Sequence, residues 1–381
     1  MRLLWYSGLA AYWGRLSPDV LARVDRGTVG GGEAAFLQTA FGLADLGHEV
    51  VACHPGLPGH YRGVDFHPTW DFDKIAASER WDAVVSWSDP RPLRSPSVAP
   101  HVARLFPQQL NDLAAGVHGI DTIVSPSWSH VEMLKRLWVD HGGKTSDLPV
   151  FAVSGSGVTC KYPEAFVWPR EPLVGYWSSP DRGLVHLLRV WPEVKRAVPA
   201  AKLIVGYEIE NWLALIRNCY GRLAPMHGWY RHQGEIVARL LDECSRLDVT
   251  TTGALPRKKL AEIQQRCRIF CYPLDNGGDY VEGFCVAALE ALAAGCWPVL
   301  SPVDALPEVY KGMIGDWIPR GDEPELQRTL IERLLHPPGQ STFKSNFELA
   351  AKYTWRAASI QMEAAIVNAW SRHNATIPGA A

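Results

Sequence analysis

The feature that most constrains the fold is an alternation of short apolar segments of strand length with segments of helical period along the whole chain. In the first half we expect strands at 3–7, 49–53, 82–87, 101–106, 122–125 and 150–153. In the second half the same pattern restarts, and we expect strands at 173–177, 202–205, 249–252, 269–272 and 297–300. Strands that alternate with helices predict parallel sheets covered by helices on both sides.

Helical segments fill the gaps between these strands. The segment 33–46 carries apolar residues on one face, and Gly47 follows as a stop signal. A last helical pattern runs over about 354–370, after all the strands of the second half. The fold class predicted is therefore α/β, with doubly wound, Rossmann-like sheets.

Length and proline placement predict two domains. The chain has 381 residues, of which 47% are apolar, and this is enough to bury two ordinary cores. Two prolines within the segment 166–172 predict a hinge there. We expect an N-terminal domain over 1–165 and a C-terminal domain over 166–352. The helix within 353–373 either stays with the second domain or returns to the first, and the tail 374–381 is expected to fray. A cleft between two such domains would bind ligands at the carboxyl ends of the strands.

Composition narrows the function classes. A formal net charge of −2 does not point to a polyanionic partner, and no run of about 18 apolar residues predicts a membrane span. The first residues, 1–7, are too short for a signal-peptide core. Eight cysteines form no CxxC pair or Cys/His cluster, and Cys267 and Cys271 lie in a predicted buried strand. We therefore expect reduced thiols in a cytoplasmic protein without structural zinc.

The most informative segment for chemistry begins at Glu282 and ends at Gly295, just before a predicted strand. It contains two carboxylates, Glu282 and Glu290, separated by seven residues. The first is expected in a loop at a helix N-terminus, beside backbone N–H groups that can hold a diphosphate. The second is expected about two turns along the helix, where a carboxylate can accept hydrogen bonds from a ribose diol. An amphipathic helix with two solvated glutamates is the alternative.

This segment resembles the E-x7-E signature of the glycogen-synthase-like class of retaining GT-B glycosyltransferases, the glycosyltransferase family 4-like class. The resemblance implies a GT-B fold, in which two Rossmann-like domains face each other across a cleft. It also implies that Glu282 contacts the donor sugar and Glu290 the ribose of the nucleotide. Gly283 and Phe284, at the start of the helix, would hold the diphosphate.

Two further segments resemble conserved loops of that class. Gly31 and Gly32, after the first strand, resemble its N-terminal glycine-rich loop, where a missing Cβ lets the backbone approach the donor; a plain glycine turn is the alternative. Ser178, Ser179 and Arg182 follow the first strand of the second domain. Arg182 matches the second of two basic residues that grip the diphosphate, and the first is missing here.

Lys259, together with its neighbours Arg257 and Lys258, would replace part of the missing positive charge, the alternative being a solvated helix start. The histidine that many members carry near the transferred sugar is also absent. Gln108 and Asn111 lie in its place, and Ser127 resembles a further sugar contact.

The loop 275–280 comes just before Glu282 and holds two aspartates and two glycines. A divalent-metal site there is weighed against a plain loop or donor-sugar contacts from Gly278 and Tyr280. We expect no metal, because the loop offers few certain oxygen ligands.

The resemblance implies an enzyme that moves a hexose from a UDP-, GDP- or ADP-sugar to an acceptor hydroxyl with retention, with Glu282 and Arg182 as catalytic residues. The nucleotide sugar would be a co-substrate, and no cofactor is expected. The acceptor remains open between a glycan, a lipid-linked sugar, a small molecule and a modified base in DNA, as in viral DNA glycosyltransferases. A non-catalytic module that binds nucleotide sugars or glycans is the alternative of another class.

Overall fold

The computed structural model describes residues 1–8, 31–55, 58–107, 113, 116–158, 168–218, 227–275 and 282–375. The chain divides into two compact units. Unit 1 comprises Met1–Gly157 and Tyr353–Ala381, and unit 2 comprises Val158–Lys352. Among the helices in the described ranges, none is both long and apolar enough to cross a membrane.

An eight-stranded sheet forms the centre of unit 1, in the order β3-β4-β2-β1-β5-β6-β7-β8. Its strands are β1 (Arg2–Ser7), β2 (Glu49–Cys53), β3 (Gly59–Tyr61), β4 (Val64–His67), β5 (Ala83–Trp87), β6 (Ala103–Pro107), β7 (Thr122–Ser125) and β8 (Val150–Val153). β1 pairs in parallel with β2 through Leu3↔Val50 and with β5 through Leu3↔Ala83. From β1 the chain first adds strands on one side and then, from β5, on the other, so the strand order reverses between β1 and β5.

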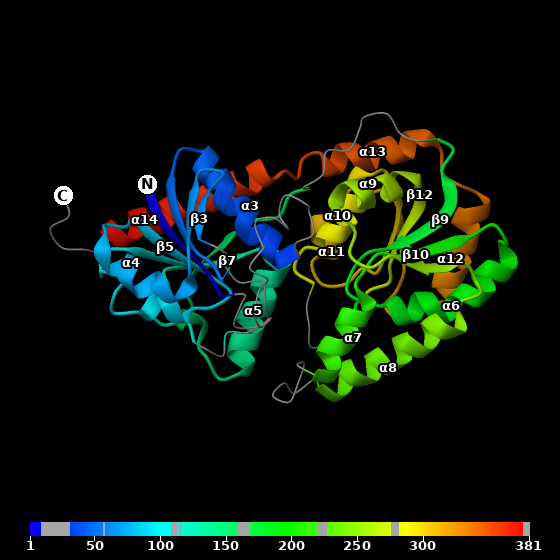
Figure 1. Ribbon diagram of the computed structural model, residues 1–381, viewed down its shortest axis with the longest axis horizontal. Helices are drawn as coiled ribbons and strands as arrows, with labels where there is room; N and C mark the ends of the chain where they lie inside the picture. The colour runs from blue at the N-terminus through cyan, green and yellow to red at the C-terminus, as the bar shows by residue number, and fades with distance from the viewer. Residues whose placement is uncertain are drawn as a thin grey trace. The chain divides into compact units, whose positions relative to one another are not determined.

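Two helices far apart in sequence pack together on this sheet. Figure 1 draws α3 (Gly31–Asp45) in blue beside the red α14 (Trp355–Ala375), and the two are in contact. Gly42 of α3 meets Ser359 of α14 so closely that an added Cβ would lie 2.0 Å from the serine Oγ. The other helical segments in the described part of unit 1 are η1 (Thr69–Asp71), α4 (Phe72–Ser78), η2 (Arg91–Arg94), α5 (Trp128–Asp140) and η3 (Thr145–Asp147).

The sheet of unit 2 has six strands in the order β11-β10-β9-β12-β13-β14. They are β9 (Glu171–Tyr176), β10 (Lys202–Val205), β11 (Val249–Thr251), β12 (Cys267–Tyr272), β13 (Trp297–Leu300) and β14 (Asp316–Trp317), and all pairs are parallel. The chain winds outward from β9 to β11 and then from β12 to β14 in the opposite direction. The carboxyl ends of β9 and β12 therefore border a reversal of strand order, which is where such sheets bind ligands.

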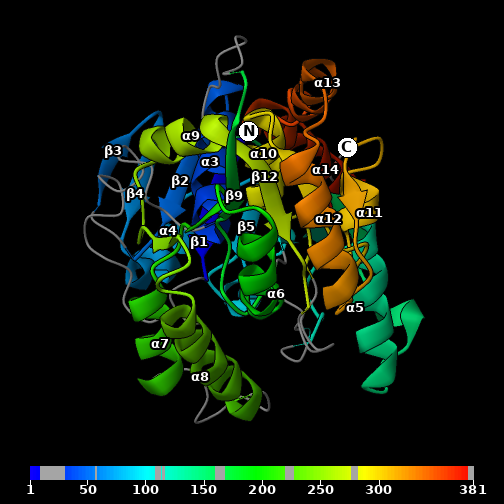
Figure 2. The ribbon, with the colours of Figure 1, turned by 90° about the vertical axis from the view of Figure 1, so that its right-hand side faces the viewer.

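The helices of unit 2 pack in two groups. α6 (Leu184–Ala197) contacts α8 (His227–Glu243) and α12 (Glu323–Leu335), and α8 also contacts α7 (Ile209–Asn218). Figure 2 shows α7 and α8 as a helical pair next to α6. In the other group α10 (Val286–Ala293) packs against α13 (Gln340–Ala350). The remaining helices are α9 (Arg257–Arg266) and α11 (Leu306–Val309).

The predicted α/β class with two parallel, doubly wound sheets is confirmed. One edge of the unit 1 sheet differs from the predicted parallel arrangement, because β3 runs antiparallel to β4. Arg62 and Gly63 join these strands, both with positive φ (49° and 77°), as in two-residue hairpins. The role of Pro172 also differs from the prediction, because Pro172 lies inside β9 and does not break the strand. It precedes Leu173, the first residue that pairs with β10, and a proline is tolerated at the start of a strand.

Candidate active site

The candidate site lies at the carboxyl edge of the unit 2 sheet, where the strand order reverses. Arg182 lies in the loop that follows β9, and Glu282 lies in the loop that follows β12. Asp304 follows β13, the next strand of the sheet. Three neighbouring strands thus deliver their loops to one place, because the carboxyl ends of parallel strands share an edge.

Glu282 is the centre of this cluster, and both of its carboxylate oxygens are bonded. One accepts the backbone N–H groups of Phe284 (3.2 Å) and Cys285 (2.9 Å), the two residues that immediately precede helix α10. The other accepts the Tyr272 hydroxyl at 2.8 Å and the Arg182 guanidinium at 3.3 Å. Burial raises the pKa of Tyr272 well above its ordinary value, so the phenol stays neutral and donates. The carboxylate is held in one orientation beside a cation and a helix N-terminus.

The backbone around Glu282 is unusual. Its N–H donates to the Asp304 carboxylate at 2.8 Å. Asp304 has a φ of 54° and Cys285 a φ of 65°, which are left-handed values that non-glycine residues rarely adopt. Strained positions of this kind persist where the surrounding structure enforces them, and they cluster at functional sites.

Glu290 lies further along α10 and is buried, with its side chain 7% exposed. It forms an ion pair with Arg257, the first residue of α9. Burial raises the pKa of Glu290, and the charge of Arg257 opposes that shift. A buried carboxylate held by one arginine is not the solvated glutamate of the alternative interpretation, and its second oxygen can accept further hydrogen bonds.

The loop between β9 and α6 is ordered by its own hydrogen bonds. The Ser179 hydroxyl bonds the carboxylate of Asp181, and the Tyr176 hydroxyl donates to the Ser179 carbonyl at 2.6 Å. Arg182 contacts Asp181 as well, at 3.3 Å, so its guanidinium lies between two acids. Gly183, with a φ of 93°, precedes α6 and lies against the Pro273 carbonyl.

Four other predicted site residues belong to α9 or to unit 1. Lys259 is exposed and pairs with Glu262 on α9, so Arg257 is the basic residue that reaches Glu290. Gly31 and Gly32 are the first residues of α3 in unit 1. Ser127 caps α5, accepting the His130 N–H at 3.2 Å. Their proposed contacts stay predictions.

Four predicted residues lie outside the described part of the chain. They are Gln108, Asn111, Gly278 and Tyr280. Of the loop considered as a metal site, only Asp275 is described, and its carboxylate bonds His186 at 3.1 Å and Arg320 at 2.7 Å.

Sequence reasoning missed Tyr272 and Asp304. Each had a signal: Tyr272 is the last residue of a predicted strand, and Asp304 follows the next one, so both belong at the same sheet edge as Glu282. Asp181 was missed too, although it adjoins Arg182 in the predicted phosphate loop.

Unit 2 is similar in sequence to a known protein family, and the whole chain is similar in fold to solved structures. Residues 178–349 match the family model described as glycosyl transferases group 1. No curated protein is similar enough in sequence to be matched. Among solved structures, sucrose-phosphate synthase from Thermosynechococcus elongatus is similar over 98% of this chain and 100% of its own, with 15% identity and a TM-score of 0.65.

Two more structures share the fold. HepE of Anabaena, solved with UDP and glucose, has 14% identity and a TM-score of 0.63 over 97% of this chain and 100% of its own. α,α-Trehalose 6-phosphate synthase from Burkholderia multivorans has 12% identity and a TM-score of 0.64, over 98% of both chains. The chain therefore has the GT-B fold, and the match covers nearly its whole length.

Proposed function

We propose that this chain, whose residues 178–349 match the family model of the glycosyl transferases group 1, moves a sugar from a nucleotide-diphosphate sugar to an acceptor hydroxyl with retention of configuration. The observation that carries the proposal is the cluster of Arg182, Glu282 and the start of α10 at the reversal of strand order in unit 2. It combines a cation, a fixed carboxylate and a helix N-terminus, which suit a phosphate and a sugar side by side.

In the proposed donor complex the diphosphate lies beside Arg182 and the start of α10. Negative charge develops on the phosphate as the glycosidic bond breaks, and a fixed guanidinium beside it lowers the energy of that state. Because Glu282 already accepts the Phe284 and Cys285 N–H groups, the phosphate would contact Gly283 and the N–H groups further along the helix start. Ser178 offers a hydroxyl in place of the missing first basic residue, whereas the Ser179 hydroxyl would first have to leave the Asp181 carboxylate to which it donates.

Glu282 and Glu290 contact the two sugar rings of the donor, the transferred sugar and the ribose. The Glu282 carboxylate, held by Tyr272, would accept a sugar hydroxyl in place of the long Arg182 contact at 3.3 Å when that guanidinium turns to the diphosphate. Glu290, held by Arg257, accepts hydrogen bonds from the ribose. The departing phosphate takes the acceptor's proton, so no protein side chain acts as general base in this scheme. The reaction needs no cofactor, and the transferred group is a hexose. The cysteines in the described part of the chain are free thiols, which fits a cytoplasmic location.

The test measures release of nucleoside diphosphate from UDP-, GDP- and ADP-sugars by the full chain. We expect release from one donor, and a loss of about 10²–10³-fold in Arg182→Ala, the usual effect of removing one donor that stabilises developing charge. Arg196→Ala is the matched control, since Arg196 is exposed on α6. Proton NMR of the product then reports the anomeric configuration.

Each outcome of this experiment is informative. An inverted product contradicts retention alone. Nucleotide binding without release from any donor, with or without added acceptors, favours the non-catalytic module. A chain that binds none of the nucleotides contradicts the proposal as a whole. Binding to duplex DNA that weakens with salt would direct the acceptor search to a modified base.

A further inference from the structure

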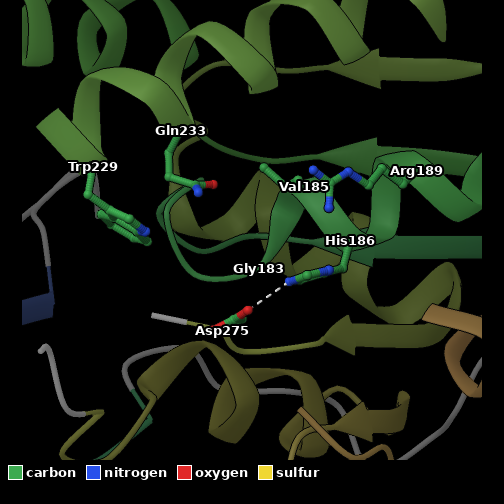
Figure 3. A pocket seen from close by; sticks show the side chains of 7 residues that line it. All are labelled: Gly183, Val185, His186, Arg189, Trp229, Gln233 and Asp275. Atoms are coloured by element: carbon green, nitrogen blue, oxygen red, sulfur yellow. Dashed lines mark hydrogen bonds and ion pairs between the residues drawn. The ribbon is translucent and has the colours of Figure 1, made fainter. Parts of the chain in front are cut away.

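A second concave site lies in unit 2, between α6, α8 and the segment after β12. It is a cavity of about 150 Å³. Figure 3 shows Trp229 and Gln233 projecting from α8 toward a space that His186 of α6 and Asp275 line from the other side. Trp229 and Gln233 are four residues apart, so both lie on one face of the helix.

Ion pairs fix the walls that face α8. The His186 ring bonds Glu323 at 2.8 Å and Asp275 at 3.1 Å, and Arg320 bonds the other oxygen of Asp275 at 2.7 Å. Arg189 donates to the same Glu323 at 3.0 Å. His186, Arg189 and Asp275 are therefore held in place before any ligand binds, which lowers the ordering cost of binding.

The two residues on α8 have a different character. The Gln233 amide is half-buried and makes no hydrogen bond to any residue within the described ranges. Trp229 presents an indole, whose only ring contact in that part of the chain is with Tyr230. An amide that can donate and accept, next to an aromatic face, is open to a ligand with both C–H and hydroxyl groups.

Size and charge limit the ligand. Pockets that bury drug-sized molecules measure roughly 300–1,000 Å³, so this cavity has room for one ring but not for a whole nucleotide sugar. A phosphate is disfavoured, since the charge of Arg189 is balanced by Glu323 and the Asp275 carboxylate faces the cavity. A nucleobase favours two flat apolar walls, and here only Trp229 and the buried Val185 are apolar.

We propose that this cavity, lined by Trp229, Gln233 and Asp275, is a subsite for a single neutral sugar ring. A pyranose has one face of C–H groups that packs on an indole and a rim of hydroxyls that bond an amide and a carboxylate. The subsite lies beside the donor loop, because Gly183 lines the cavity and directly follows Arg182. The inference goes beyond the proposed function, since binding of a sugar here requires neither a nucleotide nor turnover.

The test uses methyl α-glycosides of glucose, mannose and galactose as probes, with saturation-transfer NMR on the full chain. We expect one of them to bind, and to bind equally with saturating UDP present. Trp229→Ala and Gln233→Ala should each weaken binding by roughly tenfold, which corresponds to the loss of one stacking or hydrogen-bond contact. Trp70→Ala is the matched control, because Trp70 is a surface tryptophan of unit 1 and is 78% exposed.

Three results would overturn the inference: no probe binds, UDP displaces the probe, or both α8 variants bind as tightly as the parent chain. The Gln233 variant covers the case in which Trp229→Ala fails to fold. Failure of donor turnover leaves this test unaffected, because the probes carry no nucleotide. Intact turnover without probe binding would reject the subsite alone.

Discussion

Glu282 combines several roles in one side chain. Its carboxylate accepts the N–H groups of Phe284 and Cys285 just before α10, accepts the Tyr272 hydroxyl and pairs with Arg182. A carboxylate accepts at both oxygens, whereas an amide has one oxygen and one NH2 group. The ionised acid is therefore the only side chain of this length that can serve all four donors at once.

Replacing Glu282 with glutamine tests this role. In Glu282→Gln the amide nitrogen would face either the two N–H groups or the Tyr272 and Arg182 donors, so one set is left unpaired. We expect turnover of the nucleotide sugar to fall by about 10²-fold or more, with unfolding free energy lowered by about 1–3 kcal/mol. Donor-release kinetics and urea unfolding measure the two effects. Glu235→Gln, at an exposed position of α8, should change neither. Unchanged turnover in Glu282→Gln would remove this residue from the proposed site.

Two buried imidazoles make unit 1 sensitive to acid. Burial lowers the pKa of His54 and of His130 to about 4, from the ordinary 6.5. Each is neutral in the folded chain, while the unfolded chain binds a proton below pH 6.5. Their contribution to stability is thus complete above pH 6.5 and is lost as the pH falls toward 4, by up to roughly 3 kcal/mol for each group.

His130 allows a clean measurement, because neither ring nitrogen has a hydrogen-bond partner in the described structure. His130→Leu keeps a side chain of similar length and removes the titrating group. We expect the unfolding free energy of unit 1, measured with urea, to fall as the pH is lowered from 7.5 to 5. The fall should be roughly 2 kcal/mol larger in the parent chain than in this variant. His60→Leu, at an exposed position, should follow the parent. Parallel pH profiles for the parent and His130→Leu would contradict the buried neutral state.

At the scale of elements, two glycines at helix starts differ in whether the structure leaves room for a side chain. Gly183 has a φ of 93°, and an added Cβ would lie 1.9 Å from the Pro273 carbonyl oxygen. Gly31 opens α3, and an added Cβ would meet nothing within 4 Å. The loop at Gly183 is thus built around a missing side chain, while the described structure of unit 1 makes no such demand at Gly31.

Paired alanine substitutions test this difference. Gly183→Ala should destabilise unit 2 by about 2 kcal/mol or more, from left-handed strain and the clash with Pro273. Gly31→Ala should be neutral or stabilising by up to about 1 kcal/mol, since alanine has the higher helix propensity. Urea unfolding compares the two. If Gly31→Ala nevertheless loses donor turnover, a ligand approaches the backbone there, as the glycine-loop resemblance implies. Equal stability of both variants would contradict the close approach at Gly183.

The elements that could be predicted from sequence are those with a strong period. Strands such as β2, β7, β8, β10 and β13 have the predicted bounds, because each is a short, mainly apolar run, although β8 is not buried. β3 and β4 were missed because they have only three and four residues and their pairing depends on the Arg62–Gly63 turn. β14 has only two residues, which is too short for any period to appear.

At the scale of the whole molecule, contacts between distant segments limited the prediction of the site. Glu282 and Glu290 lie within one motif, so the sequence was enough to predict Glu282 in the loop before a helix and Glu290 within that helix. The pairing of Glu290 with Arg257, and of the Glu282 N–H with Asp304, depends on which strands are neighbours. Arg257, Lys258 and Lys259 could not be told apart from the sequence. Arg257 is the one that pairs with Glu290, and it is the first residue of α9.

The C-terminal helix α14 belongs to the core of unit 1, although the whole of unit 2 precedes it in the chain. Trp355, Ala358, Met362 and Ile366 of α14 are buried in the same hydrophobic cluster as Phe36, Leu37 and Phe41 of α3. On the other side of the helix Ile360 is 45% exposed. Unit 1 therefore depends on residues at the far end of the chain, whereas unit 2 is one continuous segment.

This arrangement predicts that the two units respond separately to damage in α14. Ile366→Ala removes a fully buried side chain and should destabilise unit 1 by about 2–5 kcal/mol, while Ile360→Ala should cost less than about 1 kcal/mol. Hydrogen exchange measured by mass spectrometry resolves the units. Peptides of β1, β5 and α3 should lose protection in Ile366→Ala, while peptides of β9 and β12 keep theirs, because the damaged core contains no unit 2 residue. Equal loss in both sets would mean that the units unfold as one cooperative body, and α14 would then stabilise the donor site as well as the core it packs in.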